Sequence, residues 1–176
     1  HMVLALLDAG QDVCVVDNLT TGFRFAIPDG VPFYEGDIED SALLARIFAE
    51  QGTRAVMHFA GSIVVPESVE NPLKYYHNNT AKSRSLMEAV VKAGVPHMIF
   101  SSTAATYGIP DVSPVSEDIP KRPINPYGWS KLNFDIWMEK LDKLPKNCYG
   151  VRFFNVYGPN EYHKEHMSSV VFKAYH

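Results

Sequence analysis

Cysteine and long apolar runs are scarce in this sequence, and their scarcity narrows the class of protein. Its two cysteines, Cys14 and Cys148, are too few for a disulfide framework. Both lie in apolar segments, where a cysteine behaves as a small hydrophobic residue. No apolar run approaches the roughly 20 residues that cross a bilayer, and no cationic segment precedes the apolar N-terminal run. The sequence therefore predicts a reducing, cytoplasmic compartment and no membrane partner.

Basic residues are not in excess either. The 16 Lys and Arg residues stand against 20 Asp and Glu residues, which gives a formal net charge of -4 at pH 7. Because no segment gathers the basic side chains into a stripe, nucleic acid is not an expected partner. The 46% of hydrophobic and 20% of charged residues are typical of a globular chain and exclude disorder as its main character. At 176 residues, one domain is expected.

Apolar residues recur at helical and at strand spacing in alternation along the chain. Helices are predicted over 1–10, 41–51, 71–92 and 127–141, and strands over 13–17, 31–37, 55–61, 97–103 and 149–155. Asp40 is the predicted N-cap of the second helix. The proline-rich segment 109–126 is predicted to be a long loop. This alternation favours an α/β fold with a doubly wound, mostly parallel sheet and helices on both faces.

Polar and small residues follow each predicted strand. In a sheet of this kind, ligands bind beyond the carboxyl ends of the strands. An acid there, such as Asp17, can accept hydrogen bonds from both hydroxyls of an adenosine ribose and disfavours a 2'-phosphate by charge, which favours NAD over NADP. The alternative is that Asp17 only caps the following turn. The strand-end residues are Asp17, Asn18, Asp37, Ile38, Phe59, Ala60, Gly61, Ser101, Ser102, Thr103 and Asn155.

Tyr127 and Lys131 lie four residues apart at the start of a predicted helix, and so share one face of it. A lysine ammonium beside a phenol, together with a cationic nicotinamide, lowers a tyrosine pKa from about 10 toward neutrality and makes a general acid or base. The spacing alone is a weak signal in a chain with nine tyrosines. It is strengthened by Ser102 and Thr103 at the same sheet edge, where a hydroxyl can hydrogen-bond a reacting oxygen.

Five segments together resemble a known family. They are 15–19, 58–68, 75–79, 100–108 and 126–131. In them the chain resembles the extended short-chain dehydrogenases/reductases, in their branch of nucleotide-sugar epimerases and dehydratases, and within that branch the UDP-glucose 4-epimerases. The resemblance covers essentially every residue. It implies a Rossmann-like, NAD-binding domain over 1–176, with the substrate region beginning near 155–176.

The resemblance also implies a reaction and its residues. A nucleotide-sugar would be epimerised by transient oxidation to a ketone and return of the hydride to the opposite face. Thr103, Tyr127 and Lys131 would form the catalytic set, and Thr103 and Asn155 would bind substrate. Two helical segments per subunit, near 75–93 and 127–142, would form a homodimer. The implied NAD contacts are Asp17, Asn18, Asp37, Ile38, Phe59, Ala60, Gly61, Asn79, Ser101, Tyr127 and Lys131.

The beginning of the sequence departs from that family. The glycine-rich turn and first strand that the family places just before His1 are not in this sequence, nor is the C-terminal substrate domain. That turn supplies the backbone amides that hold a pyrophosphate. We therefore expect the 176-residue piece alone to be inactive. A scaffold or interaction protein that has lost catalysis is the alternative from another class.

The last third departs in a different way. Residues 152–171 resemble the ADP-glycero-manno-heptose 6-epimerases, in which a lysine at the position of Lys164 serves as a second acid/base; a solvated loop lysine is the alternative. A 4,6-dehydratase is disfavoured because Thr103 is not followed by the Asp-Glu pair of that pattern. His163 and His166 lack the Glu and the spacing of a zinc helix, so no metal is expected. A UDP-glucose/UDP-galactose 4-epimerase is the first candidate and the 6-epimerase the second.

Overall fold

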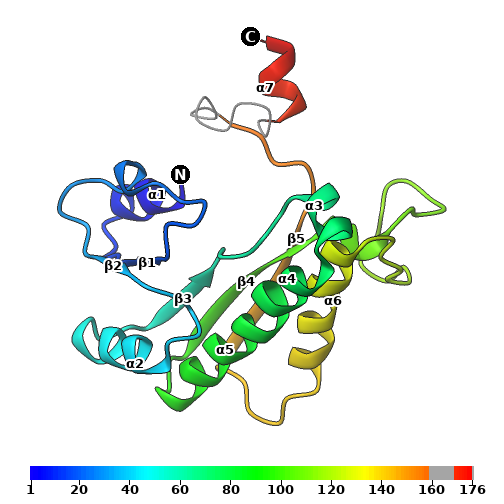
Figure 1. Ribbon diagram of the computed structural model, residues 1–176. Helices are drawn as coiled ribbons and strands as arrows, with labels where there is room; N and C mark the ends of the chain where they lie inside the picture. The colour runs from blue at the N-terminus through cyan, green and yellow to red at the C-terminus, as the bar shows by residue number, and fades with distance from the viewer. Residues whose placement is uncertain (159–168, 176) are drawn as a thin grey trace.

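The computed structural model describes residues 1–158 and 169–175, in which strands and helices alternate (Figure 1). The strands are β1 (Val15–Asp17), β2 (Phe33–Glu35), β3 (Ala55–His58), β4 (His97–Thr103) and β5 (Asn147–Phe153). The α-helices are α1 (Met2–Asp8), α2 (Ser41–Glu50), α3 (Val65–Glu70), α4 (Pro72–Tyr75), α5 (Lys82–Lys92), α6 (Pro126–Glu139) and α7 (Val170–Tyr175). Three short elements are the 3-10 helices η1 (Arg24–Ala26) and η3 (Ala104–Tyr107) and the π-helix η2 (Tyr76–Ala81).

All strand pairs are parallel, which confirms the predicted α/β class. β1 pairs with β2, and β3, β4 and β5 form a second sheet in that order. No backbone pairing joins β1 to β3 in the residues that the structure describes. β4 is hydrogen-bonded on both sides, and it pairs with β5 along its whole length, from His97 to Thr103. Parallel pairing brings the carboxyl ends of β3, β4 and β5 to one edge.

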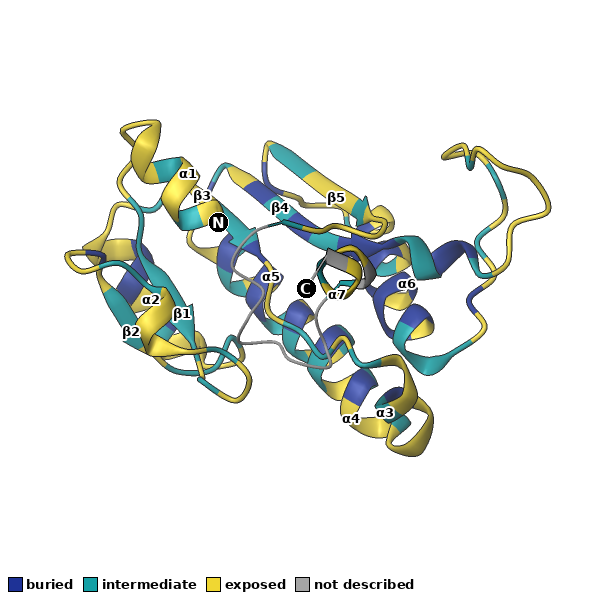
Figure 2. Cartoon of the chain, turned by 90° about the horizontal axis from the view of Figure 1, so that it is seen from above, coloured by how far each residue is buried: buried dark blue, intermediate teal, exposed yellow. Residues whose placement is uncertain are grey.

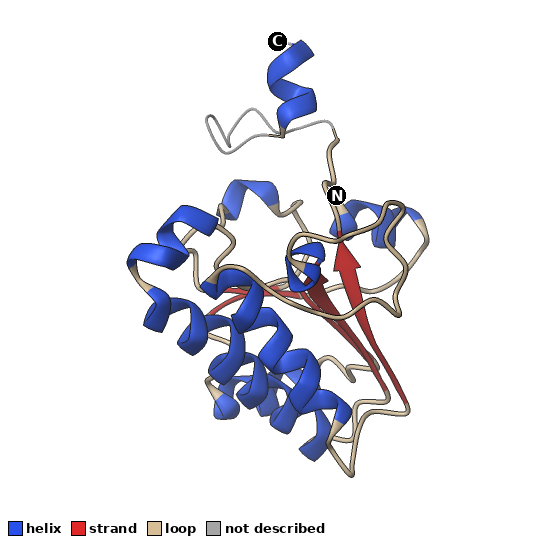
Figure 3. Cartoon of the chain, turned by 90° about the vertical axis from the view of Figure 1, so that its right-hand side faces the viewer, coloured by secondary structure: helices blue, strands red, loops and turns tan. Residues whose placement is uncertain are grey.

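The main core lies between the three-stranded sheet and one layer of helices. Met98 and Phe100 of β4 are fully buried against this layer, and the ring centroids of Phe100 and Phe134 lie 4.5 Å apart in an edge-to-face arrangement. Figure 3 shows the long helices stacked on one side of the strands, and Figure 2 shows buried residues concentrated along α5, β4 and α6. The packing fixes α6 against β4. The core residues are Leu44, Phe48, Leu86, Met87, Val90, Val95, Met98, Phe100, Phe134 and Met138.

The other face of β5 is not covered by the helices of this layer. Gly150 and Arg152 face α6, whereas Tyr149, Val151 and Phe153 alternate with them and are 36 to 60% exposed. Helices on both faces were expected, and in residues 1–158 and 169–175 the long helices cover only one face of the three-stranded sheet. None of the helices in these ranges has the length and apolarity that a membrane span requires.

Side-chain caps set the starts of the two helices that flank the core. The carboxylate of Asp40 accepts hydrogen bonds from the amides of Ala42 and Leu43, which confirms the predicted N-cap of α2. Asn125 Oδ1 accepts from the amide of Gly128 at 2.8 Å at the start of α6. Pro126 stands at the first helical position, where its missing amide costs nothing. The cap therefore ends the long proline-rich loop at a defined place.

One predicted helix has the expected bounds but is not a regular α-helix throughout. A single helix was predicted over 71–92, but the structure has α4 over Pro72–Tyr75, the π-helix η2 over Tyr76–Ala81 and then α5. Helix α3, before Asn71, was not predicted. The π turn places Asn79, fully buried, against the turn that follows β3. Tertiary hydrogen bonds thus favour a wider turn that hydrophobic spacing does not reveal.

Candidate active site

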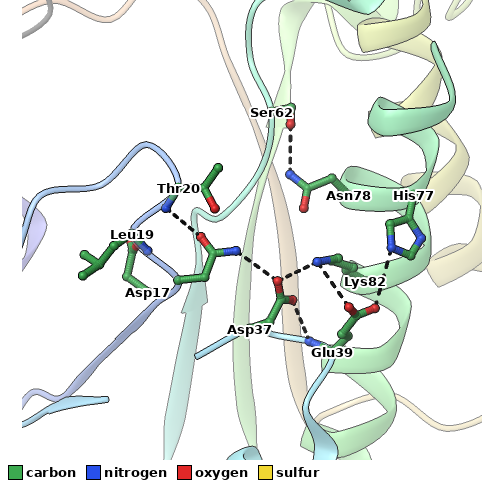
Figure 4. A network of polar contacts seen from close by, with 10 residues as sticks. Asp17, Leu19, Thr20, Asp37, Glu39, Ser62, His77, Asn78 and Lys82 are labelled. Atoms are coloured by element: carbon green, nitrogen blue, oxygen red, sulfur yellow. Dashed lines mark hydrogen bonds and ion pairs between the residues drawn. The ribbon is translucent and has the colours of Figure 1, made fainter. Parts of the chain in front are cut away.

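The ends of β1 and β2 bring polar side chains together (Figure 4). Asp17 Oδ1 accepts a hydrogen bond from the amide of Leu19 at 2.7 Å, so this carboxylate does cap the turn after β1. Gly22 lies so close that an added Cβ would be 2.7 Å from Asp17 Oδ2. Asn18 Nδ2 donates to Asp37 Oδ2 at 3.0 Å. The structure therefore assembles three of the predicted cofactor residues at one sheet edge.

Asp37 also connects β2 to helix α5. Its Oδ2 forms an ion pair with Lys82, and its Oδ1 accepts from the amide of Glu39 at 3.1 Å. Lys82 Nζ lies 3.3 Å from Glu39 Oε1, and the other oxygen of this carboxylate, Oε2, lies 3.8 Å from His77 Nε2. Burial raises the pKa of Asp37, but hydrogen bonds from Lys82 and Asn18 outweigh it and lower the pKa below its ordinary value. Asp37 is therefore a fixed anion.

The turn after β3 is held by Asn79. Asn79 Oδ1 accepts from the amide of Ser62 at 2.8 Å, and its Nδ2 donates to Ser62 O and to Ser130 Oγ. A Cβ on Gly61 would lie 3.0 Å from Asn79 Oδ1 and 3.1 Å from Lys131 Nζ, so a larger residue would require these side chains to move by a few tenths of an ångström. The side-chain amide of Asn79 thus orients the Gly61–Ser62 turn beside Lys131.

Lys131 is buried to within 2% exposure beneath the end of β4. Its Nζ donates to Ser101 O at 3.0 Å and lies 5.0 Å from the centroid of the Phe100 ring. Burial lowers the pKa of Lys131 to about 8, although the charge of Asp135 raises it. An ammonium has three N–H donors, and two of those of Lys131 have no acceptor among the described residues.

Tyr127 and Thr103 approach the same place from α6 and β4. An added Cβ on Gly128 would lie 2.7 Å from Ala105 O, so the first turn of α6 packs directly on η3. That helix begins straight after Thr103, whose Oγ1 accepts from the amide of Ala105 at 3.2 Å. The ring of Tyr127 stands edge-on to Tyr75, 6.4 Å away. The structure therefore brings the predicted catalytic residues Thr103, Tyr127 and Lys131 to one sheet edge.

His58, at the end of β3, is a buried titratable residue that sequence reasoning did not select. Its Nε2 lies 2.8 Å from Ser83 Oγ, and its ring packs on Phe100 and Phe134. Burial and, to a lesser extent, the charge of Lys131 lower its pKa to about 3. His58 is therefore a neutral imidazole below the site and not a second base.

Other predicted site residues take no part in these contacts. Phe59 is 45% exposed, with its ring 6.4 Å from Phe153, and Ala60 and Asn155 are exposed. Ile38 is half-buried and flanks the core. Lys164, His163 and His166 lie outside the described residues. Within 1–158 and 169–175, no three His, Cys, Asp or Glu side chains gather as a metal site would need.

The donors and acceptors at this edge fit a dinucleotide. Asp17 Oδ2 receives no hydrogen bond from any residue in the described ranges, and it lies where a ribose diol is expected in such sheets. Lys131 keeps two unpaired N–H groups at the other end of the edge, which suit a second ribose. Sequence alone could not have revealed Lys82, Asp135 or Arg152, because each acts through a partner distant in the chain.

The model of the family described as "NAD dependent epimerase/dehydratase" matches residues 1–176. Among curated proteins, a UDP-glucose 4-epimerase of Azospirillum brasilense is 48% identical over 163 residues, covering 90% of this chain and 46% of that protein. One from Lactobacillus helveticus is 46% identical over 161 residues, covering 90% of this chain and 48% of its own length. The chain thus spans about half the length of these relatives.

Solved structures of UDP-glucose 4-epimerases are also similar to this chain. The UDP-glucose 4-epimerase of Brucella ovis, crystallised in complex with NAD, matches with a TM-score of 0.86 at 38% identity, covering 91% of this chain and 49% of that one. The Thermotoga maritima UDP-glucose 4-epimerase with UDP-glucose matches with a TM-score of 0.84 at 35% identity, covering 92% and 54%. At these identities the likeness extends beyond the fold to sequence ancestry.

Proposed function

The chain belongs to the NAD-dependent epimerase/dehydratase family, and from that membership we propose that it is the NAD-binding part of a nucleotide-sugar epimerase. The substrate region would begin near 155–176. The observation that supports the proposal is the packing of α6 on the end of β4: the buried Lys131 donates to Ser101 O, and the first turn of α6, which contains Tyr127, packs on η3 directly after Thr103. General acid/base chemistry on a sugar hydroxyl needs these groups.

Each residue of this set has a separate task. Tyr127 takes the proton of the reacting hydroxyl and returns it in the second half of the reaction. Lys131 supplies the positive charge that stabilises the phenolate, and its two remaining N–H groups hold the nicotinamide ribose. Thr103 hydrogen-bonds the same substrate oxygen, which keeps it in line with Tyr127. Asn155, exposed after β5, is placed to contact the sugar nucleotide.

NAD, when bound, supplies the redox chemistry, taking up a hydride from the sugar carbon and giving it back to the opposite face. Asp17 would accept from the adenosine ribose through Oδ2, and the fixed anion Asp37, with Asn18 and Ile38, would border the adenine. The Gly61–Ser62 turn, shaped by Asn79, would pass close to the cofactor together with Phe59, Ala60 and Ser101. Relatives crystallised with NAD support this assignment.

The proposed substrates are UDP-glucose and UDP-galactose. The relatives 46 to 48% identical are UDP-glucose 4-epimerases, and one solved relative carries UDP-glucose. An ADP-heptose 6-epimerase is the second candidate, favoured only by residues 152–171 with Lys164. The two differ in chemistry, because a 4-epimerase serves both half-reactions with one tyrosine, whereas a 6-epimerase uses two acid/base groups.

The test is an assay of the full-length protein on both substrates with NAD content measured in parallel. We expect conversion of UDP-galactose to UDP-glucose, none of an ADP-heptose, and no effect of Lys164→Met on the first reaction. Turnover of the ADP-heptose, lost in Lys164→Met, would replace the 4-epimerase by the 6-epimerase. Absence of both activities in folded protein would leave the scaffold alternative.

We further propose that α5 and α6 join a second copy of the chain in a homodimer. A groove of about 350 Å³ lies between η2 and the start of α5 on one side and α6 on the other, and it is lined by Tyr76, Thr80, Ala81, Arg84, Asn133, Phe134 and Trp137. The guanidinium of Arg84 lies 5.5 Å from the Trp137 ring and keeps the groove wall in place. Two helices from each subunit would pack as a four-helix bundle.

Ile136→Asp is expected to convert the dimer to monomer. Ile136 is 39% exposed on α6 beside this groove, and a buried, unpaired carboxylate at a helix interface costs several kcal/mol. Sedimentation velocity on the full-length protein measures the change. Ile109→Asp, in the proline-rich loop and 79% exposed, is the matched control and should stay dimeric. A dimer that survives Ile136→Asp would show that another surface holds the two copies.

A further inference from the structure

Below the proposed catalytic residues lies a buried carboxylate that neither the sequence motifs nor the proposed reaction uses. Asp135 follows Lys131 by four residues on α6, as Lys131 follows Tyr127, so the three side chains form one stripe on the face toward the sheet. Asp135 is only 5% exposed. Its Oδ2 accepts from Ser102 Oγ at 2.8 Å, and Ser102 directly precedes Thr103.

Arg152 reaches the same carboxylate from β5. Its Nε lies 3.5 Å from Asp135 Oδ2, its Nη1 donates to Tyr107 OH at 3.2 Å, and its guanidinium lies over the Tyr107 ring. Asp135 Oδ1 and Arg152 Nε are both buried without a hydrogen bond. The pair is thus held together by charge and not by ideal hydrogen-bond geometry.

The charges that surround Lys131 can be named from every element packed on it. α6 contributes Asp135 and Tyr127, β5 contributes Arg152 behind Asp135, and β3 contributes His58, which burial keeps neutral. β4 offers only the carbonyl of Ser101. Among the described residues, Asp135 is therefore the one anion in this group, and it is shared by the buried Lys131 and the half-buried Arg152.

We propose that Asp135 is a positioning residue of the site: its charge keeps the Lys131 ammonium protonated in its buried setting, while Arg152 and Ser102 hold that charge in place beneath Thr103. The inference rests on the proposed roles of Tyr127 and Lys131. A lysine stripped of water favours its neutral form, and only the ammonium stabilises a phenolate. Without Asp135, Lys131 would lose its proton in the pH range where the enzyme must work.

The electrostatic balance agrees with this arrangement. Burial lowers the pKa of Lys131 to about 8, and Asp135 is the group that raises it. Burial likewise raises the pKa of Asp135, against which Ser102, Arg152 and Lys131 all lower it. The net effect raises the pKa of Asp135 above its ordinary value, so Arg152 opposes the effect of burial on Asp135, as Asp135 opposes it on Lys131.

Titration of Lys131 itself tests the proposal in the full-length protein, without cofactor or substrate. Lysines are labelled with ¹³C at Cε, the Lys131 signal is identified by its absence from Lys131→Met, and its midpoint is followed by NMR. Asp135→Asn keeps the acceptor for Ser102 but removes the charge, and should move the midpoint to lower pH by about one pH unit or more, as expected of a unit charge one helical turn away.

Two matched variants separate charge from structure. Ser102→Ala removes the hydrogen bond but keeps the charge, and should leave the midpoint of Lys131 near that of the parent. Asp135→Ser removes the same charge with a smaller polar side chain and should also move the midpoint to lower pH, which keeps the test decisive if Asp135→Asn fails to fold. Unchanged midpoints in both charge variants would overturn the proposal, as would a shift in Ser102→Ala equal to that in Asp135→Asn.

The pH profile of UDP-galactose turnover tests whether the protonation of Lys131 matters for the reaction. In Asp135→Asn the alkaline limb of kcat should move to lower pH together with the NMR midpoint, whereas a merely structural role would lower kcat equally at all pH values. A shifted midpoint in a protein without epimerase activity would leave the Lys131–Asp135 coupling intact and sink the proposed function. If the enzyme is active but neither the alkaline limb of kcat nor the Lys131 midpoint moves in Asp135→Asn, the proposed function stands and the Lys131–Asp135 coupling is wrong.

Discussion

Tyr127→Phe in the full-length protein is expected to lower UDP-galactose turnover by at least about 10²-fold while NAD stays bound, since that is the usual contribution of a positioned general acid/base. The substitution removes one oxygen and leaves the ring, which packs edge-on to Tyr75. The start of α6 is held independently by the Asn125 cap and by the packing of Gly128 on η3. Loss of activity would therefore report on the proton and not on the fold.

The measurement is kcat with UDP-galactose, together with NAD content after gel filtration. Tyr149→Phe, on the exposed face of β5, is the control and should keep parental turnover. Turnover of Tyr127→Phe within a few-fold of the parent would remove Tyr127 from the reaction. Loss of NAD together with activity would instead assign it to cofactor binding alone.

Lys131→Met is expected to abolish most turnover while leaving the protein as stable as the parent or more so. The ammonium is required for the phenolate, but its burial is costly, as its lowered pKa of about 8 shows. An unbranched apolar side chain of similar length fills the same space between Phe100 and the Gly61 turn. Activity and stability should therefore change in opposite directions.

The buried ammonium of Lys131 should also make the free energy of unfolding depend on pH. Because the pKa of Lys131 in the folded protein, about 8, is below the ordinary 10.5, the unfolded chain binds the proton more tightly. The free energy of unfolding of the parent should thus rise between about pH 8 and 10.5, by at most roughly 3 kcal/mol. Denaturant unfolding of NAD-free protein measures it. The rise should be smaller in Lys131→Met and unchanged in Lys140→Met, an exposed control at the end of α6. Equal rises in all three would contradict the prediction.

Local patterns were sufficient for much of the fold. Asp40 was predicted as an N-cap from the apolar period that follows it, and it caps α2 in the structure; Asn125, which caps α6, was not selected from the sequence. The apolar run before Asp17 and that before Thr103 each form a strand, so the strand-end residues could be placed at one edge before any coordinates. Here the determinants lie within a few residues of the element that they define.

The remainder depends on residues that are distant in sequence. Lys82 pairs with Asp37, which lies 45 residues earlier in the chain, and Ser102 binds Asp135, which lies 33 residues later. Neither helix start nor strand pattern indicates such partners, because a lysine or an aspartate on a helix is usually solvated. The tyrosine and lysine of the α6 stripe were selected from their spacing and chemistry, and a family resemblance then implied their role, whereas Asp135, one turn further on the same stripe, was not selected.

The π-helix η2 sets the rotational phase between two anchors. Upstream of its end, Asn79 reaches the turn after β3 and Ser130 of α6; just downstream, Lys82 reaches the end of β2. An α-helix advances about 100° and 1.5 Å per residue. Loss of one residue from η2 would therefore turn α5 by roughly that angle, and Leu86, Met87 and Val90 would leave the core as Lys82 left Asp37. The segment thus fixes the rotation between the contact at the end of β2 and the contact at the turn after β3, and its length, more than its composition, determines that rotation.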